Sequence, residues 1–242
     1  MCKRFPDSLL ATSEEQSLKW RNNFIRTYLE CDIPQLGLRI PAETLRRFWE
    51  MLAHLQGQPL NASNISKSLG IDGKTVMRYL DLMVDLLLVR KLEPMHNNQG
   101  KRLVKSPKIY VRDSGLLHAL ARVGDKDTLL GHPLLGMSWE GFVIENILNV
   151  IDHDKIKSCF YGKSSENEID LVLEKPNHEI WAIEVKCSRA PKFKKGYRIA
   201  SEEVKSTRNL IVYPGDDQYR IEEKTEVISL KKIIKLLKEE GV

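Results

Sequence analysis

The sequence lacks any apolar run approaching the roughly 18 to 20 residues that a membrane-spanning helix needs, and its first seven residues contain no apolar signal-peptide core. It also lacks a Cys-x-x-Cys pair or histidines at zinc-site spacing around its four scattered cysteines, which are Cys2, Cys31, Cys159 and Cys187. These absences predict a cytoplasmic protein with free thiols, and they predict no disulfide framework, no zinc site and no membrane partner.

Length and charge indicate the number of domains and the class of partner less strictly. At 242 residues the chain is longer than the commonest single domain, so two domains are expected. Its 38 Lys and Arg residues exceed its 33 Asp and Glu residues, for a formal net charge of +5. That balance suits a polyanionic partner without requiring one, so the positions of the basic residues matter more than their number.

The first part of the chain is expected to be helical. Residues Ser13 to Gln16 are typical of a capping box, and a second helix is predicted from about Ala42 to Leu55, after Pro41. Residues 1–56 suggest no chemistry by themselves.

A helix-turn-helix is predicted next. A short helix around Ile65 leads to a turn at Gly70, and a second helix begins after the capping residue Asp72. The second helix places apolar residues on one stripe, namely Val76, Tyr79, Leu80, Met83 and Leu87, and leaves Lys74, Arg78 and Asp81 outward.

Two short strands, Leu88–Leu92 and Arg102–Val104, are expected around a polar tip at residues 96–101. A helix-turn-helix followed by such a hairpin is a winged helix, in which the second helix enters a major groove of duplex DNA and the wing contacts phosphates. The expected DNA-binding residues are Lys74, Arg78, Lys101, Arg102 and Lys105. The alternative is a winged helix that mediates protein contacts and whose basic surface is incidental.

The same region contains a false nucleotide motif. Gly73-Lys74-Thr75 resembles the end of a P-loop, but Ser68 stands where the motif needs its first glycine, and no apolar strand precedes it. We expect no nucleotide cofactor.

Charged residues interrupt two strand-like segments near residues 168–173 and 180–186. Side chains two residues apart share a strand face, so Glu184 and Lys186 point together while Trp181, Ile183 and Val185 bury on the other face. If the two strands pair, Asp170 meets Glu184 and Lys186.

Two clustered carboxylates repel each other unless a cation neutralises them, and oxygen ligands suit Mg or Mn. Such a metal would activate a water for phosphodiester hydrolysis, with Lys186 assisting at the phosphate. The alternative is an ordinary solvated strand face whose ion pairs contribute well under about 1 kcal/mol.

These residues resemble the PD-(D/E)xK motif of restriction-endonuclease-like nucleases, with Asp170 and Glu184-Val185-Lys186 in matching positions and Ile169 in place of the proline. The resemblance implies a further acidic residue on the preceding helix, which is Glu140, and the element order αβββαβ. We therefore expect an α+β protein of two domains, in which a helical and winged helix-turn-helix domain precedes an endonuclease-like domain with a mixed sheet.

Nearly the full length resembles the C-terminal module of bacterial and archaeal AAA-type ATPases. The residues that carry this resemblance are Trp20 to Pro34, Lys105 to Tyr110, Asp113 to Leu116, Trp139 to Val143, Glu168 to Asp170 and Glu184 to Lys186. It implies a division into an ATPase-linker segment (1–56), a winged helix (57–132) and a nuclease-like domain (133–242). The P-loop and Walker B segments are missing, which predicts a truncated member or a partner of a separate ATPase in trans, without ATPase activity of its own.

Two functions remain open. The first is a DNA-binding, Mg- or Mn-dependent endonuclease in which Asp170 and Glu184 ligate the metal and Glu140 and Lys186 assist. The second is a catalytically silent module that binds DNA or protein and works with a separate ATPase.

Overall fold

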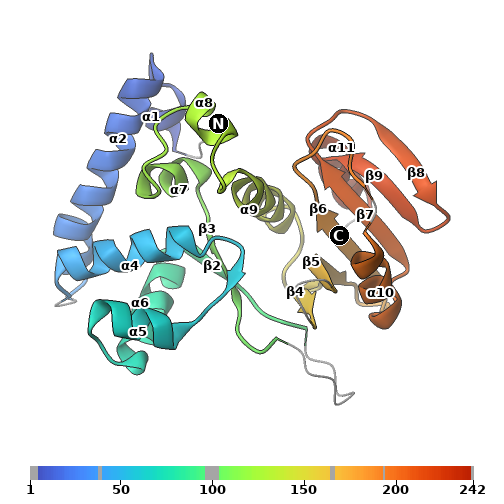
Figure 1. Ribbon diagram of the computed structural model, residues 1–242, viewed down its shortest axis with the longest axis horizontal. Helices are drawn as coiled ribbons and strands as arrows, with labels where there is room; N and C mark the ends of the chain where they lie inside the picture. Colours follow the sequence, from blue (N-terminus) through green and yellow to red (C-terminus); the bar gives the residue numbers. More distant parts are fainter. Residues whose placement is uncertain (1–4, 38–39, 96–103, 164–166, 193, 241–242) are drawn as a thin grey trace. The chain divides into compact units, whose positions relative to one another are not determined.

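The computed structural model describes residues 5–37, 40–95, 104–163, 167–192 and 194–240 (Figure 1). Contacts divide the chain into two compact units. The N-terminal unit comprises residues 1–91 and 109–141, and the C-terminal unit comprises residues 92–108 and 142–242. Helices and mixed sheets in two units make this an α+β protein of two domains, as the sequence predicts.

The N-terminal unit is mainly helical. Its helices are α1 (Pro6–Leu9), α2 (Glu14–Thr27), a π-helical turn (Tyr28–Asp32), α3 (Ile33–Gln35), α4 (Ala42–His54), α5 (Ala62–Leu69), α6 (Gly73–Asp85), α7 (Ser114–Leu120) and α8 (Lys126–Leu130). A small sheet has the strand order β1 (Gln58–Pro59), β3 (Lys108–Val111), β2 (Val89–Leu92). The expected start of α2 is confirmed, because the Gln16 N–H donates to the Ser13 hydroxyl oxygen at 3.2 Å.

One apolar core holds this unit together. Phe48 of α4 packs edge-on against Tyr79 of α6, with ring centroids 5.8 Å apart, and the same core includes Ile25 of α2, Ile109 of β3 and Leu117 of α7. The compact units therefore differ from the division at 56/57 and 132/133. The helical N-terminal segment and the helix-turn-helix bury their apolar faces against each other, so neither forms a unit alone.

The helix-turn-helix lies where the sequence predicts it. Gly70 ends α5 in the left-handed conformation, with φ at 66°, and the Thr75 N–H donates to Asp72 Oδ1 at 2.9 Å to begin α6. Four residues of the predicted stripe are buried, but Leu87 is 68% exposed. Its assignment to the stripe was wrong because α6 ends at Asp85, and Leu87 turns the chain with φ at 57°.

The predicted hairpin is only partly correct. Strand β2 matches the first expected arm, and its neighbour in the sheet among the described residues is β3. Residues 102 and 103 lie outside the described part of the chain, and Val104 is not in a strand. Instead, the Val104 N–H donates to the Gly162 carbonyl at 2.9 Å, and the Met95 N–H donates to the Phe160 carbonyl at 2.7 Å. The described parts of this connection therefore line the edge of a strand in the C-terminal unit.

The C-terminal unit contains a six-stranded mixed sheet in the order β4-β5-β6-β7-β9-β8. Its elements are β4 (Lys157–Gly162), β5 (Glu168–Glu174), β6 (Ile180–Val185), α10 (Lys195–Glu203), β7 (Arg208–Tyr213), β8 (Gln218–Glu222), β9 (Thr225–Ser229) and α11 (Leu230–Glu239), and α9 (Leu135–Leu148) crosses into it from the other unit. The predicted order αβββαβ is observed. Hairpin β8–β9 was not predicted.

The two faces of this sheet differ. Val172 and Ala182 lie in one core with Tyr197 and Ala200 of α10, so α10 covers the face to which they belong. Because side chains alternate along a strand, Asp170 and Glu184 belong to that same face. Trp181, Ile183 and Val185 are buried on the opposite face, as the sequence predicts.

Gly141 of α9 provides a stability test of the N-terminal unit. A Cβ at this position would overlap the buried side-chain amide of Gln56 and lie 3.2 Å from Tyr110 Cδ1. Gln56 cannot move freely, because its Oε1 accepts a hydrogen bond from the Val111 N–H at 2.7 Å. We expect Gly141→Ala to lower the free energy of unfolding by about 1–3 kcal/mol, as measured by urea denaturation.

Gly136→Ala is the matched control within the same helix. A Cβ there meets no atom within 4 Å. This change should leave stability unchanged or raise it by up to about 1 kcal/mol. Equal stability of the two variants would contradict the packing described here.

Candidate active site

Asp170 and Glu184 lie on neighbouring antiparallel strands. Leu171 pairs with Ile183, and one further step of this register places Asp170 opposite Glu184. Opposite residues in an antiparallel pair face the same side, with Cβ atoms about 4.5–5.5 Å apart. Both residues are buried, at 8% and 7% exposure. The predicted convergence of the two carboxylates is therefore what the strand register produces.

Backbone geometry helps to hold Asp170 in place. Its Oδ2 accepts a hydrogen bond from the Val185 N–H at 2.8 Å. The backbone pairing of β5 with β6 ends near this point, so the aspartate side chain replaces a backbone carbonyl as the acceptor. Burying a carboxylate is costly unless it is hydrogen-bonded or paired. This contact meets part of that cost and fixes the carboxylate against β6.

Lys186 extends the predicted cluster. Its ammonium group donates to Glu184 Oε1 in a short ion pair, and its N–H donates to the Val212 carbonyl of β7 at 2.9 Å. The i, i+2 spacing thus places the acid and the base on one face, as predicted.

Lys108 is a member of the cluster that sequence reasoning missed. Its side chain is 3% exposed, and its Nζ lies 2.7 Å from Glu168 Oε1 and 3.6 Å from Asp170 Oδ1. The same ammonium lies 5.5 Å from the ring centroid of Phe160. The sequence does show a lysine directly before the apolar residues Ile109 to Val111. The neighbouring residues, however, do not indicate which carboxylates Lys108 contacts.

The cluster is nearly balanced in charge. Three carboxylates, on Glu168, Asp170 and Glu184, face two ammonium groups, on Lys108 and Lys186, which leaves a formal charge of −1. The negative charge of the cluster also acts on Tyr197, whose hydroxyl donates a hydrogen bond to the Ala182 carbonyl at 2.7 Å. Burial, and then the negative charges of Glu184 and Asp170, raise the pKa of Tyr197 well above its usual value.

The carboxylates of the cluster offer oxygen ligands of the kind that Mg and Mn prefer. Within the described residues, no group of three or more His, Cys, Asp or Glu side chains is placed to hold a metal ion. Mg sites, however, commonly use one or two carboxylates and take their remaining ligands from water and substrate phosphates. The oxygen atoms of Asp170 and Glu184 fit that type of site.

Glu140 falls in the N-terminal unit. Its Oε1 accepts a hydrogen bond from the Tyr110 hydroxyl at 2.7 Å, and both residues belong to that unit. Asp170, Glu184 and Lys186 belong to the C-terminal unit. The expected contribution of Glu140 to the site therefore stays a prediction.

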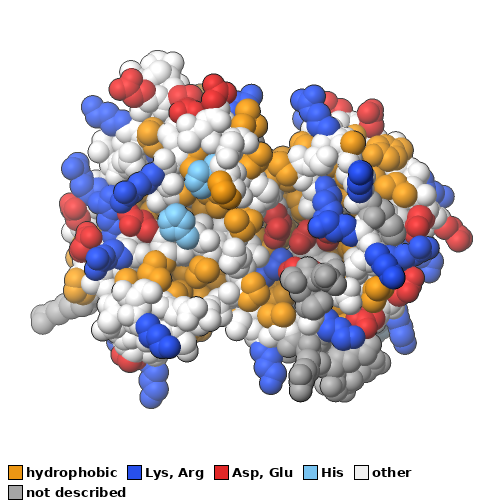
Figure 2. Space-filling model, in the orientation of Figure 1, with side chains coloured by type: hydrophobic (Ala, Val, Ile, Leu, Met, Phe, Trp, Pro, Cys, Tyr) orange, Lys and Arg blue, Asp and Glu red, His pale blue; other side chains and the backbone are white. Residues whose placement is uncertain are grey.

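The expected DNA-binding residues divide between the units. Lys74 and Arg78 are exposed on α6, whereas Lys105 is exposed in the segment assigned to the C-terminal unit. Lys101 and Arg102 lie outside the described residues. On the face drawn in Figure 2, the described Lys and Arg side chains are interspersed with Asp and Glu and form no continuous basic strip.

Comparison with known proteins finds two matching family models. Residues 4–127 match a domain of unknown function (DUF8612), and residues 135–233 match a second domain of unknown function (DUF4143). The second is commonly a C-terminal region associated with AAA-type ATPases. None of the helices in the described ranges combines the length and apolar character needed to cross a membrane.

Two curated relatives are also uncharacterized. They are protein Mb2031c of Mycobacterium bovis and protein Rv2008c of Mycobacterium tuberculosis, each 38% identical over 230 residues. The match covers 95% of this chain and 51% of each relative, so the chain spans about half the length of these relatives. The crystal structure of protein VC1899 from Vibrio cholerae aligns with a TM-score of 0.29 at 12% identity, over 96% of this chain and 56% of that one.

Lys108 offers a direct test of the charge cluster. Removing one partner of a buried ion pair leaves the other partner uncompensated, so Lys108→Met should lower the free energy of unfolding by about 3 kcal/mol. Lys163→Met is the control, because Lys163 is 37% exposed and pairs with Glu203 at 3.0 Å. A pair this exposed should contribute less than about 1 kcal/mol. Denaturant unfolding that gives equal losses for both variants would refute the burial argument.

Proposed function

The chain belongs, over residues 4–127, to the family described as a domain of unknown function (DUF8612), and we propose that it is a DNA-binding protein whose C-terminal unit hydrolyses phosphodiester bonds with the aid of Mg or Mn. The observation that carries the proposal is the convergence of Asp170, Glu184 and Lys186 on one face of the sheet. Carboxylates and an ammonium group together suit a reaction in which a phosphate gains negative charge.

Asp170 and Glu184 are the residues that would hold the metal. When bound, Mg or Mn would supply a Lewis acid that polarises the phosphate and lowers the pKa of a bound water. The Val185 N–H keeps the Asp170 carboxylate oriented. Lys186, paired with Glu184, is placed to stabilise charge on the phosphate or to orient the attacking water.

Lys108 adds a second positive charge to this arrangement. It pairs with Asp170 and Glu168 of β5, so it lowers the cost of keeping the Asp170 carboxylate buried before any metal arrives. In the proposed enzyme Lys108 is a positioning residue. It holds Asp170 in place without touching the substrate.

The helix-turn-helix supports the DNA-binding part of the proposal. The order α4, β1, α5, α6, β2, β3 is typical of a winged helix, and α6 presents Lys74 and Arg78 to solvent. In such domains the second helix of the motif reads a major groove, and basic side chains contact phosphates. We propose duplex DNA as the partner. The order αβββαβ in the C-terminal unit is likewise that of endonuclease-like folds.

A second candidate function is a catalytically silent module. It is favoured by the lysines that already pair with both carboxylates and by the absence, in the described ranges, of a group of three metal-binding side chains. In this case the charge cluster is structural, and the chain binds DNA or protein beside a separate ATPase. The association of the second domain with AAA-type ATPases supports such a partner.

Cleavage of DNA tests the first candidate. Supercoiled plasmid is incubated with the wild-type chain and Mn, and the rate is compared with those of Glu184→Gln and Lys186→Met. We expect each change to reduce cleavage by about 100-fold or more, because each removes a group that acts on the developing charge. Duplex affinity, measured by fluorescence anisotropy in the same buffers without Mn, should stay within about twofold.

Glu174→Gln is the matched control for these variants. Glu174 lies on β5 and is half-buried, and its carboxylate contacts His178 rather than the cluster. The Glu174→Gln variant should cleave the plasmid at the wild-type rate. Residual cleavage of the same rate in all proteins would indicate a contaminating nuclease and sink the catalytic proposal, whereas duplex binding without any cleavage would favour the silent module.

A further inference from the structure

We propose that the N-terminal unit contains a binding site for a small phosphorylated ligand, separate from the charge cluster of the C-terminal unit. The site is a cavity of about 490 Å³, a size usual for small-molecule sites. It lies among α2, α4 and the turn after α7, and every residue that lines it belongs to the N-terminal unit. None of the residues assigned to DNA binding or hydrolysis takes part in it.

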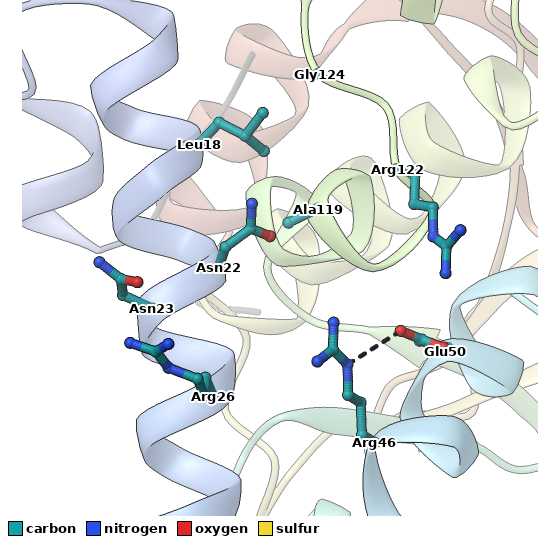
Figure 3. A pocket seen from close by; sticks show the side chains of 9 residues that line it. All are labelled: Leu18, Asn22, Asn23, Arg26, Arg46, Glu50, Ala119, Arg122 and Gly124. Atoms are coloured by element: carbon teal, nitrogen blue, oxygen red, sulfur yellow. Dashed lines mark hydrogen bonds and ion pairs between the residues drawn. The ribbon is translucent and has the colours of Figure 1, made fainter. Parts of the chain in front are cut away.

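Polar side chains from three directions reach this cavity (Figure 3). The guanidinium groups of Arg46, on α4, and of Arg122, after α7, point toward the same space, and the amide of Asn22 on α2 faces it. Asn23 and Arg26 lie at the rim along α2. The apolar wall includes Ala119.

The cavity carries excess positive charge. Three arginines, Arg26, Arg46 and Arg122, line it together with a single carboxylate, Glu50, which gives its lining a formal charge of +2. Glu50 Oε1 lies 3.3 Å from Arg46 Nε, so this carboxylate is already paired within α4. Among the residues drawn in Figure 3, no hydrogen bond or ion pair engages the guanidinium groups of Arg26 and Arg122. Like charges placed close together without a counter-ion repel each other, and an anion in the cavity would relieve this repulsion.

The backbone at Arg122 is a second, independent observation. Its φ is 59°, a left-handed conformation that disfavours side chains other than Gly, Asn and Asp. The turn itself follows a common helix ending, in which the Val123 N–H donates to the His118 carbonyl at 2.8 Å. A glycine would adopt this left-handed conformation with less steric strain. The same conformation follows other helices at Leu87 and Lys205; at Arg122 it places the guanidinium group at the cavity.

The chemistry of the lining points to a phosphoryl group. The planar fork of arginine donates two parallel hydrogen bonds to phosphate oxygens, and a phosphomonoester carries close to two negative charges, which matches the formal charge of the cavity. The carboxamide of Asn22 can both donate and accept hydrogen bonds, which suits a hydroxyl group on the remainder of the ligand. A cavity of about 490 Å³ suits a small ligand better than the extended backbone of a duplex.

Isothermal titration of inorganic pyrophosphate into the full chain tests the proposal. We expect saturable binding to the wild type and at least tenfold weaker binding to the double variant Arg46→Gln, Arg122→Asn. Asparagine is chosen because it tolerates the left-handed backbone at position 122. The control, Arg47→Gln with Lys126→Asn, removes the same two charges from exposed residues outside the cavity and should change affinity less than twofold.

A second measurement does not depend on the variants folding. Pyrophosphate should raise the unfolding temperature of the wild type above that in sodium chloride of equal ionic strength, since a ligand that binds only the folded state stabilises it. A 12-base-pair duplex at equal phosphate concentration distinguishes the source of the phosphate. Failure of the wild type to bind pyrophosphate, equal weakening in both double variants, or binding to the duplex alone would each overturn the proposal.

Discussion

The burial of charge inside a β-sheet is the constraint on which the C-terminal unit depends. Asp170 and Glu184 occupy positions in β5 and β6 that otherwise hold apolar side chains, and both are nearly covered. Such residues remain ionised in a folded protein only when hydrogen bonds and opposite charges replace the water they lose. The Val185 N–H, Lys108 and Lys186 supply these interactions, so the fold and the candidate site depend on the same contacts.

The same constraint involves residues 92–108, which belong to the C-terminal unit. Residues 92–108 leave the small sheet of the N-terminal unit, contact the edge of β4 through Met95 and Val104, and end at Lys108. Lys108 then brings its ammonium group to Asp170 and Glu168. A segment that looks like an independent wing in the sequence thus contributes to the charge balance of the C-terminal unit.

Local patterns were sufficient for much of this architecture. The caps at Ser13 and Asp72, the apolar stripe of α6 and the alternation in β6 are properties of neighbouring residues, and each was predicted. The pairing of Asp170 with Glu184 could be anticipated because β5 and β6 are consecutive.

The partnership of Lys108 with Asp170 depends on a contact between distant parts of the chain, so no periodicity indicates it. The edge strand β8 was missed although Tyr219 and Ile221 alternate with polar residues, because the run is only five residues long and its apolar side chains stay exposed. The end of α6 was missed because the sequence at Leu87 continues the helical stripe, although the backbone has already turned.

Titration of Mn into the wild-type chain and into the double variant Asp170→Ala, Glu184→Ala tests the central claim most directly. If these carboxylates form a metal site, the wild type binds Mn, alone or with duplex DNA present to supply phosphate ligands, and the double variant does not. Circular dichroism of the variant establishes that its fold is retained. Absence of Mn binding by the wild type in both conditions, or equal binding by the folded variant, would contradict the claim and leave the charge cluster with a structural role alone.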